Sequence, residues 1–130
     1  MPQRNADLRT KEQVFGLAFG DEARAYPLSL FDDQTVINDT LAGREVVVFA
    51  AGDATGVRAY DRGGHVFTRS PSANGQAVTL TDENGINWQA GENVLVGLDG
   101  SGSILEQVPS RDSYWFGWYA FYPHTGIYSP

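Results

Sequence analysis

The sequence predicts a mainly β fold, with antiparallel sheets in a barrel- or sandwich-like arrangement and one short C-terminal helix. Three observations carry this prediction. Short apolar runs are separated by turn residues such as Gly63-Gly64 and Asn84-Gly85, which suit hairpins because Gly and Asn tolerate positive φ. Residues 46–51 are all apolar, as in a strand covered on both faces. Residues 114–122 carry aromatic residues at helical spacing and precede Pro123, which ends a helix.

Length and composition limit the architecture and the partners. A chain of 130 residues predicts one domain, with residues 1–12 as a flexible arm and 13–130 as a single β-rich domain. The absence of cysteine excludes disulfides, thiolate metal sites and cysteine nucleophiles. Sixteen acidic residues against nine basic ones give a net charge of −7, which disfavours nucleic acid and anionic membranes as partners.

The apolar pattern predicts no membrane span, because no window approaches the roughly 18 continuous apolar residues of a spanning helix. The N-terminal segment is polar and lacks the apolar core of a secretory signal. The sequence therefore leaves the localisation open: cytoplasmic if the chain is complete, extracytoplasmic if it is a trimmed part of a longer protein.

The first third of the chain predicts a hairpin followed by a turn. Residues 13–19 and 22–28 read as two strands joined at Gly20-Asp21. A short connection, 29–34, is expected to hold at most one helical turn before a short strand at Val36. We expect 38–43, rich in turn-forming residues, to turn the chain into the buried strand.

The later elements follow the same logic. The buried strand leads into a small-residue loop, 52–56, and a second strand, 57–62. The Gly63-Gly64 turn is expected to pair that second strand with 65–69 as a hairpin. The remaining predicted strands lie between clear turn signals: 77–81, 86–89, 92–98 and 104–108.

The C-terminal helix has a predicted cap and a predicted core face. Ser113 is a good N-cap residue, and Pro123 marks the end of the helix. Four bulky aromatic residues share one face at helical spacing: Trp115, Trp118, Tyr119 and Tyr122. Such a stripe more often packs in a core than binds a ligand.

Most catalytic and cofactor motifs are missing. The glycine-rich segment 97–103 lacks the Lys-Ser/Thr ending of a phosphate loop, and the chain has no Gly-x-Ser-x-Gly elbow. The two histidines, His65 and His124, are far apart in the sequence without metal-ligand spacing. The sequence therefore predicts no metal and no cofactor, and it favours surface or hydrogen-bonding roles for both histidines.

Three aspartates stand at positions where carboxylates could act. Asp53 lies in the loop after the buried strand, Asp61 before the Gly63-Gly64 turn, and Asp82 before the other hairpin turn. Turn chemistry explains Asp82, whose side chain can accept backbone N–H groups. For Asp61, a structural ion pair is favoured over acid–base work. Its expected partners are the nearby arginines: Arg24, Arg58 or Arg62.

Taken together, these segments resemble a bacterial family known as domain of unknown function 3179, from about Val14 to Tyr128. The matching segments occur in the family's order: GDEARAYPL, VINDT, the VVV strand, AYDR, Asp82 with Trp88-Gln89, VLVG, LEQVP, WFGW and PHT. Each segment alone is weak evidence, whereas their order and spacing make the resemblance fairly specific.

The resemblance breaks at the loop after the buried strand. Many members are similar to one another in a Cys-Pro-x-Cys-type loop there, which implies thiol redox chemistry or metal capture. Alignment places those cysteines at Ala51 and Ala54. That chemistry therefore cannot be carried over to this chain.

The leading hypothesis for function is a non-redox module that binds a small molecule or a protein, because both cysteines are lost while the surrounding scaffold is kept. The predicted ligand-binding residues lie in or near the loop and on the helix: Asp53, Thr55, Asp61, Arg62, Trp115 and Trp118.

Two alternatives from other classes stay open. One is an enzyme with Asp53 or Asp61 as general base and His65 or His124 as its partner, which requires two of these groups within hydrogen-bond reach. The other is a structural accessory domain of a larger assembly, which predicts an exposed apolar patch and a concentration-dependent mass. The sequence decides neither enzymatic activity nor oligomeric state.

Overall fold

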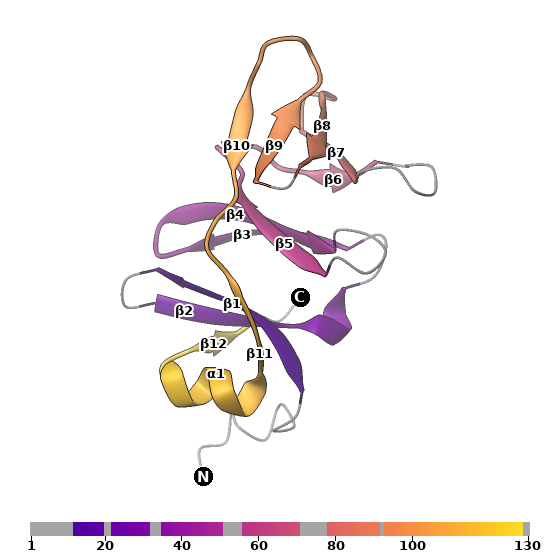
Figure 1. Cartoon of the computed structure of the whole chain (residues 1–130). Coiled ribbons are helices and arrows are strands. Elements are labelled where there is room, and N and C mark those ends of the chain that lie inside the picture. The colour runs from indigo at the N-terminus through magenta and orange to yellow at the C-terminus, as the bar shows by residue number, and fades with distance from the viewer. Residues whose placement is uncertain are drawn as a thin grey trace. The chain divides into compact units, whose positions relative to one another are not determined.

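The described part of the protein is mainly β, with one short helix near its C-terminal end (Figure 1). The computed structural model describes residues 12–19, 22–31, 35–50, 56–70, 78–91 and 93–128. These residues form strands β1 to β12, the α-helix α1 and a 3-10 turn, η2 (Leu28–Leu30). The predicted fold class is therefore confirmed. None of the helices in these ranges is long and apolar enough to cross a membrane.

Contacts along the chain divide it into two compact units. Unit 1 contains residues 1–30 and 109–130, and unit 2 contains residues 31–108. The predicted N-terminal arm lies outside the described residues except for Glu12, and the single domain over 13–130 stays a prediction. Each unit is described below by itself.

Unit 1 is built on a four-stranded sheet in the order β11-β1-β2-β12. The predicted first hairpin is confirmed as β1 (Gln13–Phe19) paired antiparallel with β2 (Glu22–Pro27). Two further strands were not predicted, because both are short and polar or rich in small residues: β11 (Arg111–Tyr114) beside β1 and β12 (Gly126–Ile127) parallel to β2.

The helix α1 (Trp115–Phe121) follows β11 directly, and its predicted cap is wrong. Ser113 belongs to β11 and pairs with Val14 of β1, so extended backbone continues up to the helix. The N-cap residue is instead Tyr114, without a side-chain cap bond. The first helical N–H, of Trp115, donates to the carbonyl of Glu12 at 2.7 Å, which satisfies one of the donors that a cap would serve.

The aromatic face of α1 packs as predicted. Trp115 and Trp118 are buried with Val14 and Ala25, and Tyr119 and Tyr122 pack against them. Trp118 lies so close to β1 that a Cβ atom on Gly16 would overlap its six-membered ring. Glycine is therefore required at position 16 by a close approach of the two elements.

Unit 2 contains two antiparallel sheets that share one core, which is a sandwich-like arrangement. One sheet has the order β3-β4-β5 and the other β10-β9-β8-β7-β6. The buried strand is confirmed as β4, in which 46–49 are fully buried. The bounds of the strands in this unit are as follows: β3 (Val36–Leu41), β4 (Arg44–Ala50), β5 (Val57–Asp61), β6 (Thr68–Arg69), β7 (Thr79–Thr81), β8 (Asn87–Ala90), β9 (Val94–Gly97) and β10 (Ile104–Glu106).

The shared core of unit 2 contains large side chains from both sheets. They form one cluster of buried residues: Val47, Phe49, Tyr60, Phe67, Val78, Leu80, Trp88, Ala90 and Leu95. Burial of this apolar surface is the main stabilising contribution that the sequence pattern predicts for this unit. Two residues of this core, Phe67 and Trp88, lie next to the candidate site described below.

Two predictions about turns in unit 2 are confirmed only in part. Ala42 and Gly43 do turn the chain into β4, with φ of 55° and 77°, but residues 38–40 belong to β3 and do not turn. The side-chain amide of Asn38 donates to the carbonyl of Phe67 and its carbonyl accepts the N–H of Phe67, both at 2.9 Å. The side chain of Asn38 thus pairs with the backbone of Phe67 as a neighbouring strand would, which explains the polar residue at that position.

The second correction concerns the predicted hairpin after β5. Gly63 and Gly64 do form a tight turn with φ of 55° and 83°, and the N–H of His65 donates to the carbonyl of Arg62 at 2.8 Å. After this turn, however, the chain enters β6, which pairs with β7. The segment between them is held by side chains from elsewhere, including Asn38 and Glu83.

Candidate functional site

The predicted site residues fall in three places. Asp53 and Thr55, with the rest of the loop 51–55, lie outside the described residues. Asp61, Arg62 and His65 lie in unit 2. The others lie in unit 1: Trp115, Trp118 and His124.

Asp61 forms an ion pair within its own sheet. Its Oδ1 atom accepts the Nε–H of Arg44 at 3.1 Å, so the partner is not one of the three arginines that the sequence favoured. The register explains the choice: Asp61 faces Val46 across β4 and β5, and Arg44, two residues from Val46, shares its face. The predicted ion pair is real, but its arginine was wrongly assigned.

Arg62 ties the turn to β3 and β4. Its Nε–H donates to the carbonyls of Asp39 and Val46 at 3.2 and 3.1 Å, and its Nη1 atom donates to the carbonyl of His65 at 3.1 Å. Only 11% of its side chain is exposed. Its guanidinium also donates to Oγ1 of Thr40 at 3.1 Å and pairs with Glu45 at 3.6 Å, so Arg62 has a structural role.

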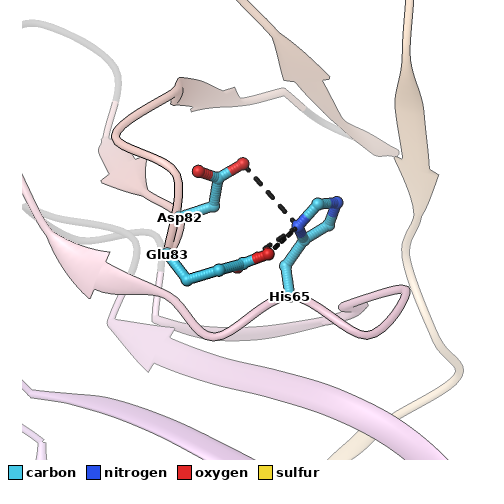
Figure 2. Close-up of side chains that lie close together, drawn as sticks. All are labelled: His65, Asp82 and Glu83. Carbon is cyan, nitrogen blue, oxygen red and sulfur yellow. Dashed lines mark hydrogen bonds and ion pairs between the residues drawn. The ribbon is translucent and has the colours of Figure 1, made fainter.

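The structure brings His65 together with two carboxylates, as Figure 2 shows. Nδ1 of His65 lies 3.0 Å from Oε2 of Glu83 and 3.7 Å from Oδ2 of Asp82. The histidine comes from the loop before β6, and both acids come from the turn between β7 and β8. We call these three residues the His65 cluster.

Asp82 is the fixed member of the His65 cluster. Its side chain is fully buried. Oδ1 accepts the backbone N–H groups of Asn84 and Ile86 at 2.8 and 3.0 Å, as turn chemistry predicts, and Oδ2 accepts the indole N–H of Trp88 at 3.0 Å. Burial raises the pKa of Asp82, but these hydrogen bonds, together with the charge of His65, outweigh it and hold the pKa below its usual value.

Glu83 is the exposed member of the His65 cluster. Its Oε1 atom accepts the backbone N–H of Val66 at 2.9 Å. This bond, with smaller contributions that include the hydrogen bond to His65, lowers the pKa of Glu83. Both carboxylates are therefore ionised at neutral pH. They face a single imidazole nitrogen.

Two aromatic rings hold the imidazole from the side. The ring centroids of Trp88 and Phe67 lie 5.4 and 5.8 Å from that of His65. In Figure 2 the other ring nitrogen of His65, Nε2, points away from both carboxylates. The sequence missed Glu83, because only the folding of two distant turns brings it to His65. The acidic pair Asp82-Glu83 in a hairpin turn was the one available signal.

Unit 1 contains a small hollow beside α1. It has a volume of about 160 Å³ and is lined by residues of β1, of α1 and of the segment that enters β11: Gly16, Ala18, Pro109, Ser110, Arg111, Trp118 and Tyr122. Trp118, a predicted ligand-binding residue, contributes to this lining, and Trp115 does not; both side chains are buried in the core of unit 1. His124 is exposed in the turn after α1.

The polar groups around this hollow differ in their availability. The indole N–H of Trp118 donates to Oγ1 of the buried Thr125 at 2.7 Å, so the indole offers mainly its carbon atoms. The guanidinium of Arg111 lies 5.6 Å from the centroid of the Phe121 ring. In the described part of the chain no carboxylate pairs with Arg111. We call the hollow and this arginine the Arg111 hollow.

Comparison with protein-family models identifies the family of this chain. The model of a family described as a protein of unknown function (DUF3179) matches residues 1–125. The chain belongs to this family. No curated protein and no solved structure matches it.

Membership in the DUF3179 family confirms the resemblance that the sequence motifs indicated. The chain is a cysteine-free member and so lacks the Cys-x-x-Cys loop. The family description assigns no activity, so a function has to be argued from the His65 cluster and the Arg111 hollow.

Proposed function

We propose that this domain is a non-redox binding module that holds the carboxylate end of a small organic molecule in the Arg111 hollow. The observation that carries the proposal is a cationic side chain, with no carboxylate partner among the described residues, at the edge of an aromatic-lined hollow. Ligand sites combine apolar walls with a few placed polar groups. The Arg111 hollow has both parts.

The chemistry of the lining favours an anionic group joined to an apolar one. A guanidinium binds a carboxylate through two parallel N–H···O bonds. Trp118 and Tyr122 provide aromatic surface next to it, and the small side chain of Ala18 adds to the lining. A benzoate-like molecule therefore fits this lining better than a cation or a sugar does.

The size of the hollow sets a limit on the ligand. Its volume of about 160 Å³ is below the roughly 300 Å³ at which pockets for drug-sized molecules begin. We therefore expect the hollow to bind a small acid, or only the acidic end of a larger one. Weak binding of fragment-sized probes is the expected behaviour.

The proposal is tested by NMR titration of the whole chain with benzoate and with its neutral analogue benzamide. Benzoate should shift the indole resonance of Trp118 but not that of Trp88 in unit 2, and benzamide should bind more weakly. Arg111→Gln should reduce benzoate affinity roughly 10- to 100-fold, from the ~1.5–3 kcal/mol of a charge-assisted hydrogen bond.

Arg44→Gln is the matched control, because it removes an arginine that pairs with Asp61 in unit 2. It should leave benzoate binding unchanged. Equal affinities for benzoate and benzamide, or an Arg111→Gln variant that binds like the wild type, would rule the proposal out.

A second candidate function, a structural accessory domain, has one observation in its favour. Three aromatic side chains of β11 and α1 are exposed: Tyr114, Phe116 and Phe121, the last at 73%. Tyr114 and Phe116 stack with ring centroids 6.0 Å apart. If they form a contact surface, the mass in sedimentation should rise with concentration and Phe116→Ser should abolish the rise.

The enzymatic alternative gains no support from the described residues. It needed Asp61 or Asp53 within hydrogen-bond reach of a histidine. Asp61 bonds Arg44, His65 bonds Glu83, and Asp53 lies outside the described residues. The acid that contacts a histidine is therefore a different one from those that the sequence singled out.

A further inference from the structure

We propose that the His65 cluster is a binding site for a divalent transition-metal cation such as zinc. Its ligands are Nδ1 of His65, Oδ2 of Asp82 and Oε2 of Glu83. This proposal does not rest on the carboxylate site in unit 1. Imidazole nitrogen together with carboxylate oxygen is a ligand set that zinc and its neighbours accept.

The spacing of the three ligand atoms fits one ion. All three lie within 4.8 Å of one another, with Nδ1 at 3.0 Å from Oε2 and 3.7 Å from Oδ2. Two ligands that each bind zinc at about 2.0–2.2 Å are separated by roughly 3.0–3.5 Å at tetrahedral or octahedral angles. Nδ1 of His65 and Oε2 of Glu83 already lie at such a separation. A small rotation of the His65 ring would bring Nδ1 and Oδ2 of Asp82 into the same range, and the exposed Glu83 side chain can adjust to the ion.

The orientation of Asp82 is the observation that separates this cluster from an ordinary surface ion pair. Its Oδ1 atom has two backbone donors, whereas Oδ2 has one, the indole N–H of Trp88. The same oxygen of this fully buried side chain faces Nδ1 of His65 (Figure 2). At 3.7 Å that separation is too long for a hydrogen bond.

The groups around Asp82 resemble an outer shell for a metal ligand. Ligating carboxylates are themselves hydrogen-bonded by neighbouring groups that fix their direction. Trp88 and the two backbone N–H groups do this for Asp82, and Val66 does it for the other oxygen of Glu83. The site is thus preorganised on one side and open on the side of Glu83, where water can complete the coordination.

The charge balance also favours a dication. Two ionised carboxylates face one imidazole nitrogen, so even a protonated His65 would leave one negative charge. Arg62 donates to the backbone carbonyl of His65 and not to these side chains. A bound cation would take the place of the proton between Nδ1 and Oε2 of Glu83, and it would neutralise both carboxylates.

Isothermal titration of the metal-stripped full chain with zinc chloride tests the proposal. We expect one ion per chain, and at least a tenfold loss of affinity in both His65→Gln and Glu83→Gln. His124→Gln and Glu106→Gln are matched controls, because both residues are exposed and neither belongs to the cluster. These controls should bind zinc like the wild type.

A second readout locates the ion independently of affinity. Zinc should shift the indole N–H resonance of Trp88, which contacts Asp82, and leave those of Trp115 and Trp118 in place. Circular dichroism of each variant verifies that it is folded. The proposal is overturned if zinc gives no heat and no Trp88 shift, or if His65→Gln and Glu83→Gln bind it as tightly as the wild type.

Discussion

Replacing Asp82 by alanine should destabilise the protein far more than the same change at a similar aspartate. Asp82→Ala removes the acceptor for two backbone N–H groups and for the indole of Trp88, all at or beside the core of unit 2. Each buried donor left without a partner costs about 1–3 kcal/mol. Because the turn N–H groups can partly reach water, we expect a total loss of roughly 3–5 kcal/mol.

Asp99→Ala provides the comparison. Asp99 also stands at a hairpin turn and accepts the N–H of a residue two positions on, Ser101, at 3.0 Å, but its bonds are exposed. Its loss should cost much less stability than the loss of Asp82, because water can replace the exposed bonds. Urea unfolding followed by circular dichroism, with chelator present, measures both variants. Equal losses would refute the argument that burial makes the Asp82 bonds important.

The same residue predicts the response to acid. The pKa of Asp82 is lower in the folded protein than in the unfolded chain, so its stabilising contribution is complete above the unfolded value. That contribution is lost as the pH falls through the folded value. The free energy of unfolding should therefore decrease below the usual aspartate range in the wild type. Asp82→Ala should show a smaller decrease, and parallel curves for the two proteins would contradict this.

Two further predictions test the packing and the turn. Gly16→Ala should cost about 1–3 kcal/mol because its methyl group displaces Trp118, whereas Gly126→Ala, with open space around it, should cost less in the same thermal unfolding assay. Arg62→Ala should lower the urea midpoint clearly, because it removes a largely buried side chain that donates to three backbone carbonyls. Arg44→Ala removes a half-exposed ion pair, worth less than about 1 kcal/mol, and should lower the midpoint much less. Similar values within either pair would contradict the reasoning.

Local sequence signals predicted those elements whose residues face a core or a tight turn. The run 46–51 marked β4 because both faces of that strand are covered, and Asn84-Gly85 marked a hairpin because Gly85 takes a φ of 83° in the turn. The sequence signals failed where a side chain bonds to the backbone of a residue far away in the sequence. Asn38 was read as a turn residue, although its amide pairs with the backbone of Phe67 29 positions away.

The candidate sites show the same limit more strongly. Turn chemistry correctly explained Asp82, and helical spacing correctly grouped Trp115 with Trp118. The partner of His65, however, is Glu83, and the two are brought together by a segment that crosses from one sheet of unit 2 to the other. The cation of the hollow, Arg111, belongs to a short polar strand that pairs with β1 only across the length of the chain. No local pattern encodes either contact.

The pairing of β1 with β11 also has a consequence for synthesis on the ribosome. Unit 2 is continuous in the sequence, so all of its strands are available once residue 108 has emerged. The sheet of unit 1 is assembled from both ends of the described chain and needs segments about a hundred residues apart. Contacts between residues so far apart in the sequence form slowly. We therefore expect the apolar face of the β1–β2 hairpin to stay exposed to solvent until α1 has been synthesised and can pack against it.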